Sequence, residues 1–381
     1  MRFKLYQPKV FKALLSLLII SFGLLVFFST LWGRSFLKTT LLLPEILPSF
    51  PVHPLVLLTR PPVEDQVGVI SGSKVIKTYI FRPNDSEKHP AIILMATGFS
   101  PTSGTITNYA ESFSRIGFAT FVPDFPDLSE VKKVSLKPEQ VDDLVKIFQT
   151  VSKEEFVDSK KVGFLGICAG GSLALVAAED PSISSQVGFV ILVSVYFDGY
   201  STIKQIYLDK IFEDSGGHDW TPAESTVLTA DRLLVNSLED EKDREVLEGF
   251  INGKGEEEPT ELSQDGRVIY DFIRNKDQNQ FSRLWEQLPP NTKKVLTELS
   301  PSTKIADLSA HTFILTDTTD SFVPKSEGSN LAARLPKDQR DYIGLDLLEH
   351  SQLARKLPRL KTLIEIGKAF IFVRKIFAFV S

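Results

Sequence analysis

Short, continuous apolar runs recur along most of this 381-residue chain, and they constrain its fold more than any other feature. The runs are Val67–Ile70, Val75–Phe81, Ala91–Met95, Phe118–Val122, Val162–Gly166, Phe189–Tyr196, Phe313–Thr316 and Tyr342–Leu345. Most are apolar at consecutive positions, as in strands that are buried on both faces of a parallel sheet. Helical patterns fall between them, for example at Gln140–Val151 and Gly171–Ala178. This alternation predicts α/β architecture with a mostly parallel, doubly wound sheet.

The composition is that of a globular protein, with 43% hydrophobic and 24% charged residues, which argues against disorder. The 43 basic and 48 acidic side chains give a net charge of −5, so we expect no nucleic-acid partner. The single cysteine, Cys168, excludes an intramolecular disulfide and a cysteine-rich zinc site. Metal-ligand spacings and phosphate-binding glycine motifs are also lacking, so we expect no metal and no cofactor.

The amino terminus contains an uncharged apolar run from Ala13 to Gly33. At 1.5 Å per residue, these 21 residues span a hydrocarbon core of about 30 Å. Basic residues precede the run at positions 2, 4, 9 and 12 and follow it closely only at 34 and 38, which predicts a cytoplasmic tail over 1–12 and an extracytoplasmic catalytic domain. A cleavable signal peptide is the alternative, but its apolar part would be shorter and would end in small residues.

The rest of the chain divides into four parts. Residues 34–65 hold six prolines among many leucines, which predicts an irregular connecting segment lying on the folded domain or on the bilayer. Residues 66–198 and 306–381 are expected to form the two parts of one core. The hundred or so residues between them are far more than one crossover needs, and their helical periodicity predicts an inserted helical cap over 199–305.

The sharpest chemical signal is the segment Lys161-Val-Gly-Phe-Leu-Gly-Ile-Cys-Ala-Gly-Gly171, in which a buried strand leads at once into a helix. A sharp strand-to-helix turn of this kind exposes its central side chain, here that of Cys168, and is called a nucleophile elbow. The flanking Gly166, Gly170 and Gly171 are needed because side chains there would collide with neighbouring backbone. A small buried cysteine in a glycine-rich turn gives the same local pattern.

Two further segments favour a nucleophile. Phe313-Ile-Leu-Thr-Asp-Thr-Thr-Asp320-Ser-Phe-Val-Pro324 places acidic residues after a strand, and His350 follows thirty residues later. The order nucleophile, acid, histidine is that of hydrolases whose triad lies on successive loops at one sheet edge. Asp320 is favoured over Asp317 as the acid because it precedes Phe-Val-Pro. The backbone N–H groups of Phe99 and Ala169 are placed to form an oxyanion hole.

With these residues assembled, the chain resembles the α/β-hydrolase superfamily. Its Gly-x-Cys-x-Gly-Gly elbow and its Asp-x-Phe-Val-Pro motif are similar to those of the dienelactone hydrolase group, whose nucleophile is a cysteine. The resemblance implies an α/β-hydrolase fold and a triad of Cys168, Asp320 and His350. The apolar amino terminus, the proline-rich segment and the insertion are not part of a compact dienelactone hydrolase, so the small lactone substrates of that family are not carried over.

Two remaining features have less specific interpretations. His218, in Gly216-Gly-His-Asp-Trp220, is expected in a turn between helices, although it would be able to approach the site from the insertion. The basic, apolar carboxyl end from Ser351 to Ser381 is expected to form a helix. That helix covers the sheet, and its phenylalanines with flanking cations also suit a membrane surface.

Two classes of function follow. The first is a membrane-anchored hydrolase that cleaves an ester, lactone or thioester of a small, apolar or amphipathic acyl substrate through a covalent acyl-enzyme. The second is a catalytically weak or inactive hydrolase fold that serves as a membrane-tethered binding protein. The intact acid and histidine favour the enzyme. The sequence leaves the oligomeric state open.

Overall fold

A mostly parallel sheet organises the computed structural model, which describes residues 8–46, 52–213, 216–254, 258–346, 348 and 358–380. Within these residues the main sheet has eight strands in the order β1-β2-β4-β3-β5-β6-β9-β10. Their bounds are β1 Val63–Ser71, β2 Lys74–Arg82, β3 His89–Ala96, β4 Ala119–Pro123, β5 Val157–Ile167, β6 Phe189–Val193, β9 His311–Asp317 and β10 Arg340–Leu345. Only the β1–β2 and β2–β4 pairs of this sheet are antiparallel. The α/β-hydrolase fold predicted from the sequence is confirmed, and each predicted strand is present.

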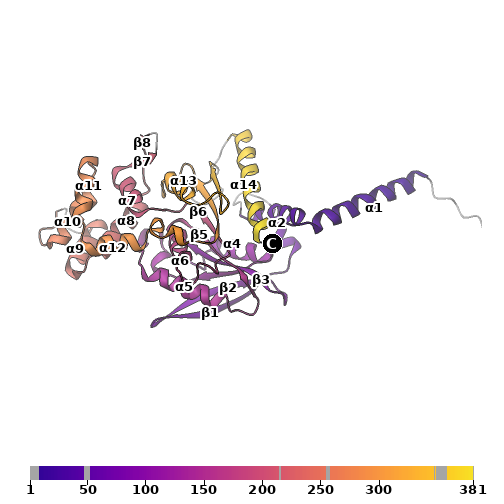
Figure 1. The fold of residues 1–381 in the computed structure, drawn as a ribbon, viewed down its shortest axis with the longest axis horizontal. Helices are drawn as coiled ribbons and strands as arrows, with labels where there is room; N and C mark the ends of the chain where they lie inside the picture. The colour runs from indigo at the N-terminus through magenta and orange to yellow at the C-terminus, as the bar shows by residue number, and fades with distance from the viewer. Residues whose placement is uncertain are drawn as a thin grey trace, which may run out of the picture.

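Alternate residues of the central strands serve two separate cores. Ile93 of β3 packs on one face of the sheet and its neighbour Ile92 on the other, as the two-residue period of a strand requires. The first face is covered by α5 (Glu139–Val151), α6 (Cys168–Ala178) and α13 (Lys325–Arg334). The second is covered by α2 (Leu31–Ile46), α4 (Gly104–Arg115) and α14 (Arg359–Val380). Helices thus lie on both faces of the sheet (Figure 1), and most side chains of its central strands are buried and apolar.

Part of the proline-rich segment is helical, which corrects the prediction of an irregular connection over 34–65. Helix α2 contains Pro44 in its last turn, where the missing N–H removes a single hydrogen bond. Pro54 opens the short helix α3 (Pro54–Leu58), a position that needs no N–H donor. The buried Glu45 carboxylate accepts from the backbone N–H of Leu55 at 2.6 Å and ties the two helices together.

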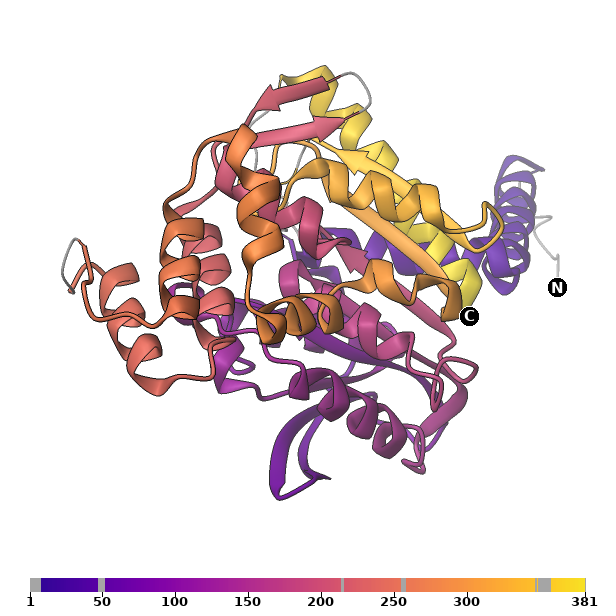
Figure 2. The ribbon, with the colours of Figure 1, turned by 60° about the vertical axis from the view of Figure 1, so that its left-hand side comes forward.

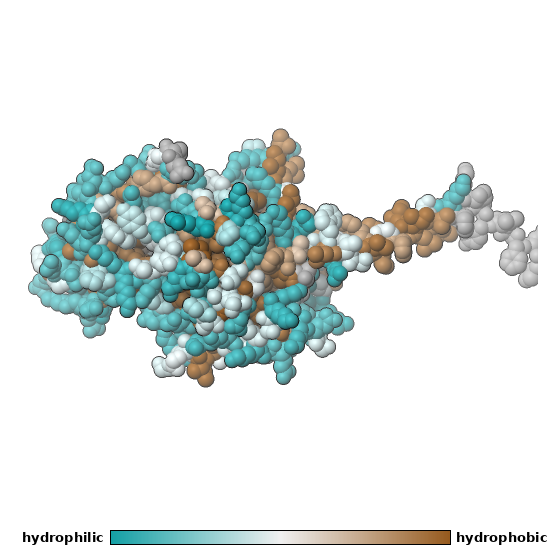
Figure 3. All heavy atoms as spheres, in the orientation of Figure 1, coloured by the Kyte–Doolittle hydropathy of each residue, from teal (hydrophilic) through white to brown (hydrophobic). Residues whose placement is uncertain are grey.

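Helix α1 (Pro8–Ser29) projects from the folded body, with its apolar side chains exposed (Figures 1 and 3). Its stretch Lys12–Ser29 is, within the described part of the chain, the one helical segment long and apolar enough to cross a membrane. A membrane span and a signal sequence both meet this description. The helix ends at Ser29 and α2 begins at Leu31, so the apolar run Ala13–Gly33 is divided between two helices.

The insertion between β6 and β9 lies beside the strand ends (Figure 2). Its helices are α7 Gly199–Leu208, α8 Glu224–Asn236, α9 Glu241–Ile251, α10 Gln264–Arg274, α11 Gln278–Gln287 and α12 Pro290–Glu298. A two-stranded antiparallel ribbon, β7 (Lys210–Glu213) with β8 (Gly216–Asp219), interrupts them. His218 therefore lies in a strand and not in a helical turn, because its backbone pairs with that of Ile211. Its ring lies 3.5 Å from the Glu213 carboxylate, on the exposed ribbon.

Candidate active site

Cys168 occupies a strained backbone position at the junction of β5 and α6. Its φ angle is +55°, in the left-handed region that side chains other than glycine rarely adopt. Strand β5 ends at Ile167, and Cys168 is the first residue of α6. The chain therefore turns from strand to helix without an intervening loop, which is the geometry predicted for the elbow. Strain of this kind is held in place by the surrounding structure and is common at functional sites.

The glycines around Cys168 are required by close backbone packing. A Cβ atom on Gly166 would lie 2.2 Å from the Cα atom of Gly171, and one on Gly171 would lie 2.5 Å from a methyl group of Val195. A Cβ atom on Gly170 would meet the backbone of Ala96 at 3.1 Å. The start of α6 thus packs directly on the ends of β3 and β5, and a larger residue at any of these three positions would displace it.

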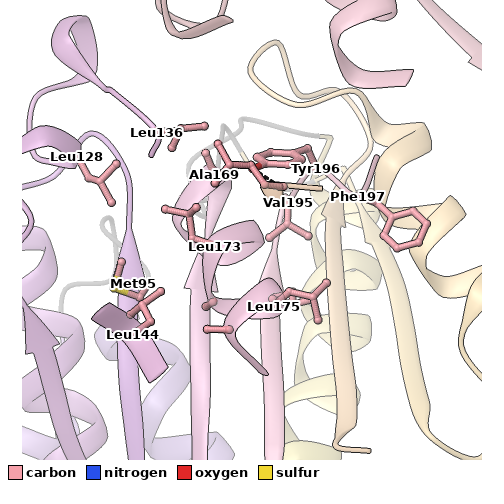
Figure 4. Close-up of a cluster of buried hydrophobic side chains, with 14 of the residues drawn as sticks. Met95, Leu128, Leu136, Leu144, Ala169, Leu173, Leu175, Val195, Tyr196 and Phe197 are labelled. Carbon is pink, nitrogen blue, oxygen red and sulfur yellow. Dashed lines mark hydrogen bonds between the residues drawn. The ribbon is translucent and has the colours of Figure 1, made fainter. Parts of the chain in front are cut away.

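An apolar cavity of about 420 Å³ opens at the elbow. Cys168, Ala169 and Phe99 are all on its wall, together with Leu136 and Tyr196, which lie with Ala169 along one edge of the buried cluster in Figure 4. None of the lining residues in the described part of the chain is charged. The cavity is thus suited to an uncharged, apolar group.

Much of the cavity wall comes from the insertion. Helix α7 contributes Ile203 and Ile206, and α8 contributes Thr226, Ala230 and Leu233. The end of the insertion contributes Leu296 and Leu299. Residues inserted between β6 and β9 thus face the same space as Cys168, so the insertion shapes the volume in front of the elbow.

The oxyanion-hole candidates lie on two segments at this space. Ala169 is the second residue of α6, and the first four N–H groups of a helix have no partner within the helix. Phe99 follows Gly98, whose φ angle is +81° and whose N–H donates to the carbonyl of Leu128 at 2.7 Å. That hydrogen bond ties the loop after β3 to the segment that follows β4. Both residues line the cavity with Cys168.

Both acid candidates lie at the carboxyl end of β9. Asp317 is the last residue of the strand, is fully buried, and accepts from the N–H and hydroxyl of Thr319 with one oxygen, each at 2.9 Å. Asp320 lies in the following loop, is 4% exposed, and accepts from the N–H of Phe322 at 2.7 Å. Phe322 and Val323, next to Asp320, line the cavity. His350 lies outside the residues that the structure describes.

Tyr196, which sequence reasoning did not single out, borders the cavity together with Cys168. Burial raises the pKa of its hydroxyl, with a smaller contribution from Cys168. The neutral hydroxyl donates to the carbonyl of Leu299 at 2.9 Å, and the Tyr196 carbonyl accepts from Ser172 at 2.8 Å. Tyr196 therefore connects α6 to the end of the insertion. Only its position at the end of the predicted strand Phe189–Tyr196 indicated, from the sequence, that Tyr196 lies near the site.

Known proteins are similar to the central part of the chain. Residues 76–191, which include the elbow, match the dienelactone hydrolase family. A probable 2-oxo-3-(5-oxofuran-2-ylidene)propanoate lactonase of Bradyrhizobium sp is 29% identical over 138 residues, 33% of this chain and 55% of the relative. An uncharacterized 31.7 kDa protein in the traX-finO intergenic region of Escherichia coli is 28% identical over 114 residues, 28% of this chain and 40% of the relative. The chain thus spans about half the length of the curated relatives it matches.

Solved structures align over more of the chain at lower identity. An esterase of Pyrobaculum calidifontis covers 92% of both chains at 15% identity, with a TM-score of 0.46. The complex of DcsB with its substrate analogue covers 83% of this chain and 100% of the other, at 17% identity and a TM-score of 0.48. Residues 76–191, which contain the elbow, are thus similar to the dienelactone hydrolase family.

Proposed function

We propose that the protein is a hydrolase that cleaves an ester, lactone or thioester with Cys168 as nucleophile, His350 as general base and acid, and Asp320 as the partner of His350. The observation that carries the proposal is the strained position of Cys168 on the wall of a cavity that it shares with Phe99 and Ala169. The match of residues 76–191 to the dienelactone hydrolase family supports the same chemistry.

In the proposed reaction the Cys168 sulfur attacks the acyl carbonyl carbon while its proton passes to His350. The tetrahedral oxyanion accepts hydrogen bonds from the N–H groups of Phe99 and Ala169. Its collapse breaks the bond to the leaving oxygen or sulfur, which takes the proton from His350 and departs as an alcohol or a thiol. Water then attacks the thioester, gives its proton to His350, and releases a carboxylic acid and the free thiol.

The cavity indicates an uncharged, apolar acyl group. The Bradyrhizobium relative is named for a propanoate, which is an anion at neutral pH. Burial of an unpaired carboxylate against an apolar wall is strongly unfavourable, and the described lining residues of this cavity carry no cation. We therefore do not carry that substrate over. A hydrocarbon chain between α7 and α8 fits the wall that Ile203, Ile206 and Leu233 provide.

Membrane anchoring through α1 belongs to the same proposal. The stretch Lys12–Ser29 is apolar and is not buried against the body. On α14, Leu360, Leu363, Ile364 and Ile371 form an exposed apolar stripe, with exposed fractions of 73%, 67%, 52% and 56%. Basic side chains such as Arg359 and Lys368 adjoin this stripe, a combination that suits an anionic bilayer surface. The proposed arrangement has the tail in the cytoplasm and the catalytic domain outside.

The central experiment uses the full chain in detergent with p-nitrophenyl acetate, octanoate and palmitate. We expect turnover by the wild type, and loss of turnover in Cys168→Ala with an unchanged circular dichroism spectrum. Because Cys168 is the only cysteine, alkylation by iodoacetamide reports on this residue alone. In His350→Ala, mass spectrometry is expected to show slow acylation at Cys168. Unchanged turnover in Cys168→Ala would refute the nucleophile, and tight ester binding without turnover in the wild type would favour the membrane-tethered binding protein.

A separate experiment tests the anchor. The full chain is expressed in a bacterial host, its amino terminus is sequenced, and its membranes are extracted with alkaline carbonate. An intact amino terminus with retention in the pellet is the expected result, and Leu18→Lys with Phe22→Lys is expected to release the protein, because both side chains are exposed on α1. A chain shortened near residue 33 would identify the segment as a cleaved signal sequence.

A further inference from the structure

Three hydrogen bonds join the insertion to the loop that carries Asp320. The indole N–H of Trp220 donates to the backbone carbonyl of Asp320 at 2.8 Å. The N–H of Ala223 donates to the carbonyl of Ser321 at 2.7 Å, and the hydroxyl of Thr226 donates to the carbonyl of Phe322 at 3.1 Å. Three successive carbonyls of the loop are thus bound by three donors from one short segment of the insertion, about one hundred residues away in sequence.

The same segment reaches the cavity. Trp220 and Ala223 precede α8, and Thr226 lies in its first turn. Thr226, Thr229 and Ala230 of α8 line the cavity, as do Phe322 and Val323 of the loop. A side chain of α8 therefore contacts the space for the acyl group on one side and the loop of the proposed acid on the other.

The far end of the loop is also tied to the insertion. Glu327 in α13 is fully buried, and one of its oxygens accepts from the backbone N–H groups of Phe197 and Asp198 at 3.0 and 2.9 Å. Its other oxygen accepts from Ser201 at 2.6 Å and from Gln205 at 2.8 Å. The start of the insertion thus holds the helix that follows the loop, and α8 holds the loop itself.

We propose that Trp220 and Thr226 are positioning residues, which hold the backbone of residues 320–322 so that the Asp320 carboxylate meets the catalytic histidine. This inference rests on the proposed function, in which Asp320 is the acid. The insertion then contributes to catalysis as well as to the shape of the cavity. If the Trp220 and Thr226 hydrogen bonds only stabilised the fold, their removal would lower the free energy of unfolding but would leave kcat of the folded enzyme unchanged.

Thr226→Val tests the inference, with Thr297→Val as a control. Thr297 also lies in the insertion, on α12, but it is exposed and away from the cavity lining, and its hydroxyl donates within the helix, to the carbonyl of Lys293 at 2.8 Å. Loss of one neutral hydrogen bond is expected to lower kcat for p-nitrophenyl octanoate about fivefold in Thr226→Val with KM unchanged. Thr226→Ser keeps the hydroxyl and is expected to restore kcat, whereas Thr297→Val is expected to match the wild type.

Trp220→Phe removes the indole N–H while keeping an aromatic ring, and Trp285→Phe is its control because Trp285 packs on Tyr200 and Phe281 in the insertion. We expect about a fivefold loss of kcat in the first variant only. Hydrogen exchange without substrate gives a readout apart from activity, with faster exchange over 319–323 in Thr226→Val than in Thr297→Val. Equal kcat and equal exchange in those two variants would overturn the inference. The proposed function fails separately, if Asp320→Asn retains full turnover.

Discussion

Gly166 and Gly171 lie so close that a Cβ atom on the first would stand 2.2 Å from the Cα atom of the second. This contact joins the end of β5 to the first turn of α6 and leaves no room for a loop between them. Cys168 lies between the two glycines, with a positive φ angle. The same turn therefore produces the tight packing of the two glycines and places the half-buried thiol of Cys168 on the cavity wall.

Gly166→Ala is expected to distort this turn. Its methyl group would meet backbone atoms that cannot move without shifting α6, so we expect a loss of about 3 kcal/mol in the free energy of unfolding. The folded fraction is expected to react more slowly with iodoacetamide at Cys168. Gly104→Ala is the control, because a Cβ atom there meets nothing within 4 Å. Chemical denaturation measures the free energy of unfolding of both variants, and equal values would contradict the packing argument.

The acid is tested by replacing each candidate aspartate with asparagine. Asp320→Asn is expected to reduce kcat by about 10³- to 10⁴-fold, because the histidine loses the partner that fixes its tautomer. Asp317→Asn is expected to be mild, since the oxygen that accepts from Thr319 remains in the amide. Steady-state kinetics with p-nitrophenyl octanoate decides between them, and reversed effects would make Asp317 the acid.

The local parts of the site were predictable from the sequence, because a strand, a glycine turn and a helix are encoded in adjacent residues. The central strands β3, β4, β6 and β9 were predictable because burial on both faces leaves a continuous apolar run, whereas the edge strand β1 is largely exposed. Helix α2 was not, because its stability depends on burial of Leu42 and Leu43 in the fold, and the prolines around it suggested an irregular segment.

The contacts of the acid loop were also beyond sequence reasoning. Nothing near Trp220 indicates that its indole binds the carbonyl of Asp320, one hundred residues away. Such a contact depends on how the insertion packs on the rest of the fold, and the local hydrophobic periodicity of the sequence does not predict this packing. The sequence predicted a cap over 199–305, but not which residues of α7 and α8 line the cavity, because these helices approach Cys168 only in the folded chain.

The cavity wall on α8 allows a test of the acyl-chain site. Ala230 is 4% exposed and lines the cavity, so Ala230→Phe is expected to fill part of it. We expect kcat/KM for p-nitrophenyl octanoate to fall at least about tenfold, the effect of a little over 1 kcal/mol of lost binding, with p-nitrophenyl acetate little affected. Leu228→Phe, on the same helix but away from the cavity lining, is the control. A uniform loss for both esters would argue against an acyl chain at α8.

Glu179 gives a prediction about pH and stability. This residue follows α6, is fully buried, and has no hydrogen-bond partner for either side-chain oxygen in the described structure. Burial raises the pKa of its carboxyl group from 4.5 to about 9, with Lys304 acting in the opposite direction. The folded state therefore binds this proton more tightly than the unfolded state does. Its contribution to stability is complete below pH 4.5 and is lost as the pH rises toward 9.

Glu179→Gln is expected to remove this pH dependence, because the amide stays neutral at every pH. The free energy of unfolding of the wild type is expected to fall by at most about 1.4 kcal/mol per pH unit within that range, and less where the structure relaxes or water enters. Urea denaturation at pH 5 and pH 8 measures the free energy of unfolding of both proteins, and the stability of Glu179→Gln relative to the wild type is expected to be greatest at pH 8. Glu155→Gln, at an exposed position, is the control. Parallel curves for wild type and Glu179→Gln across this range would show that Glu179 is ionised in the folded protein.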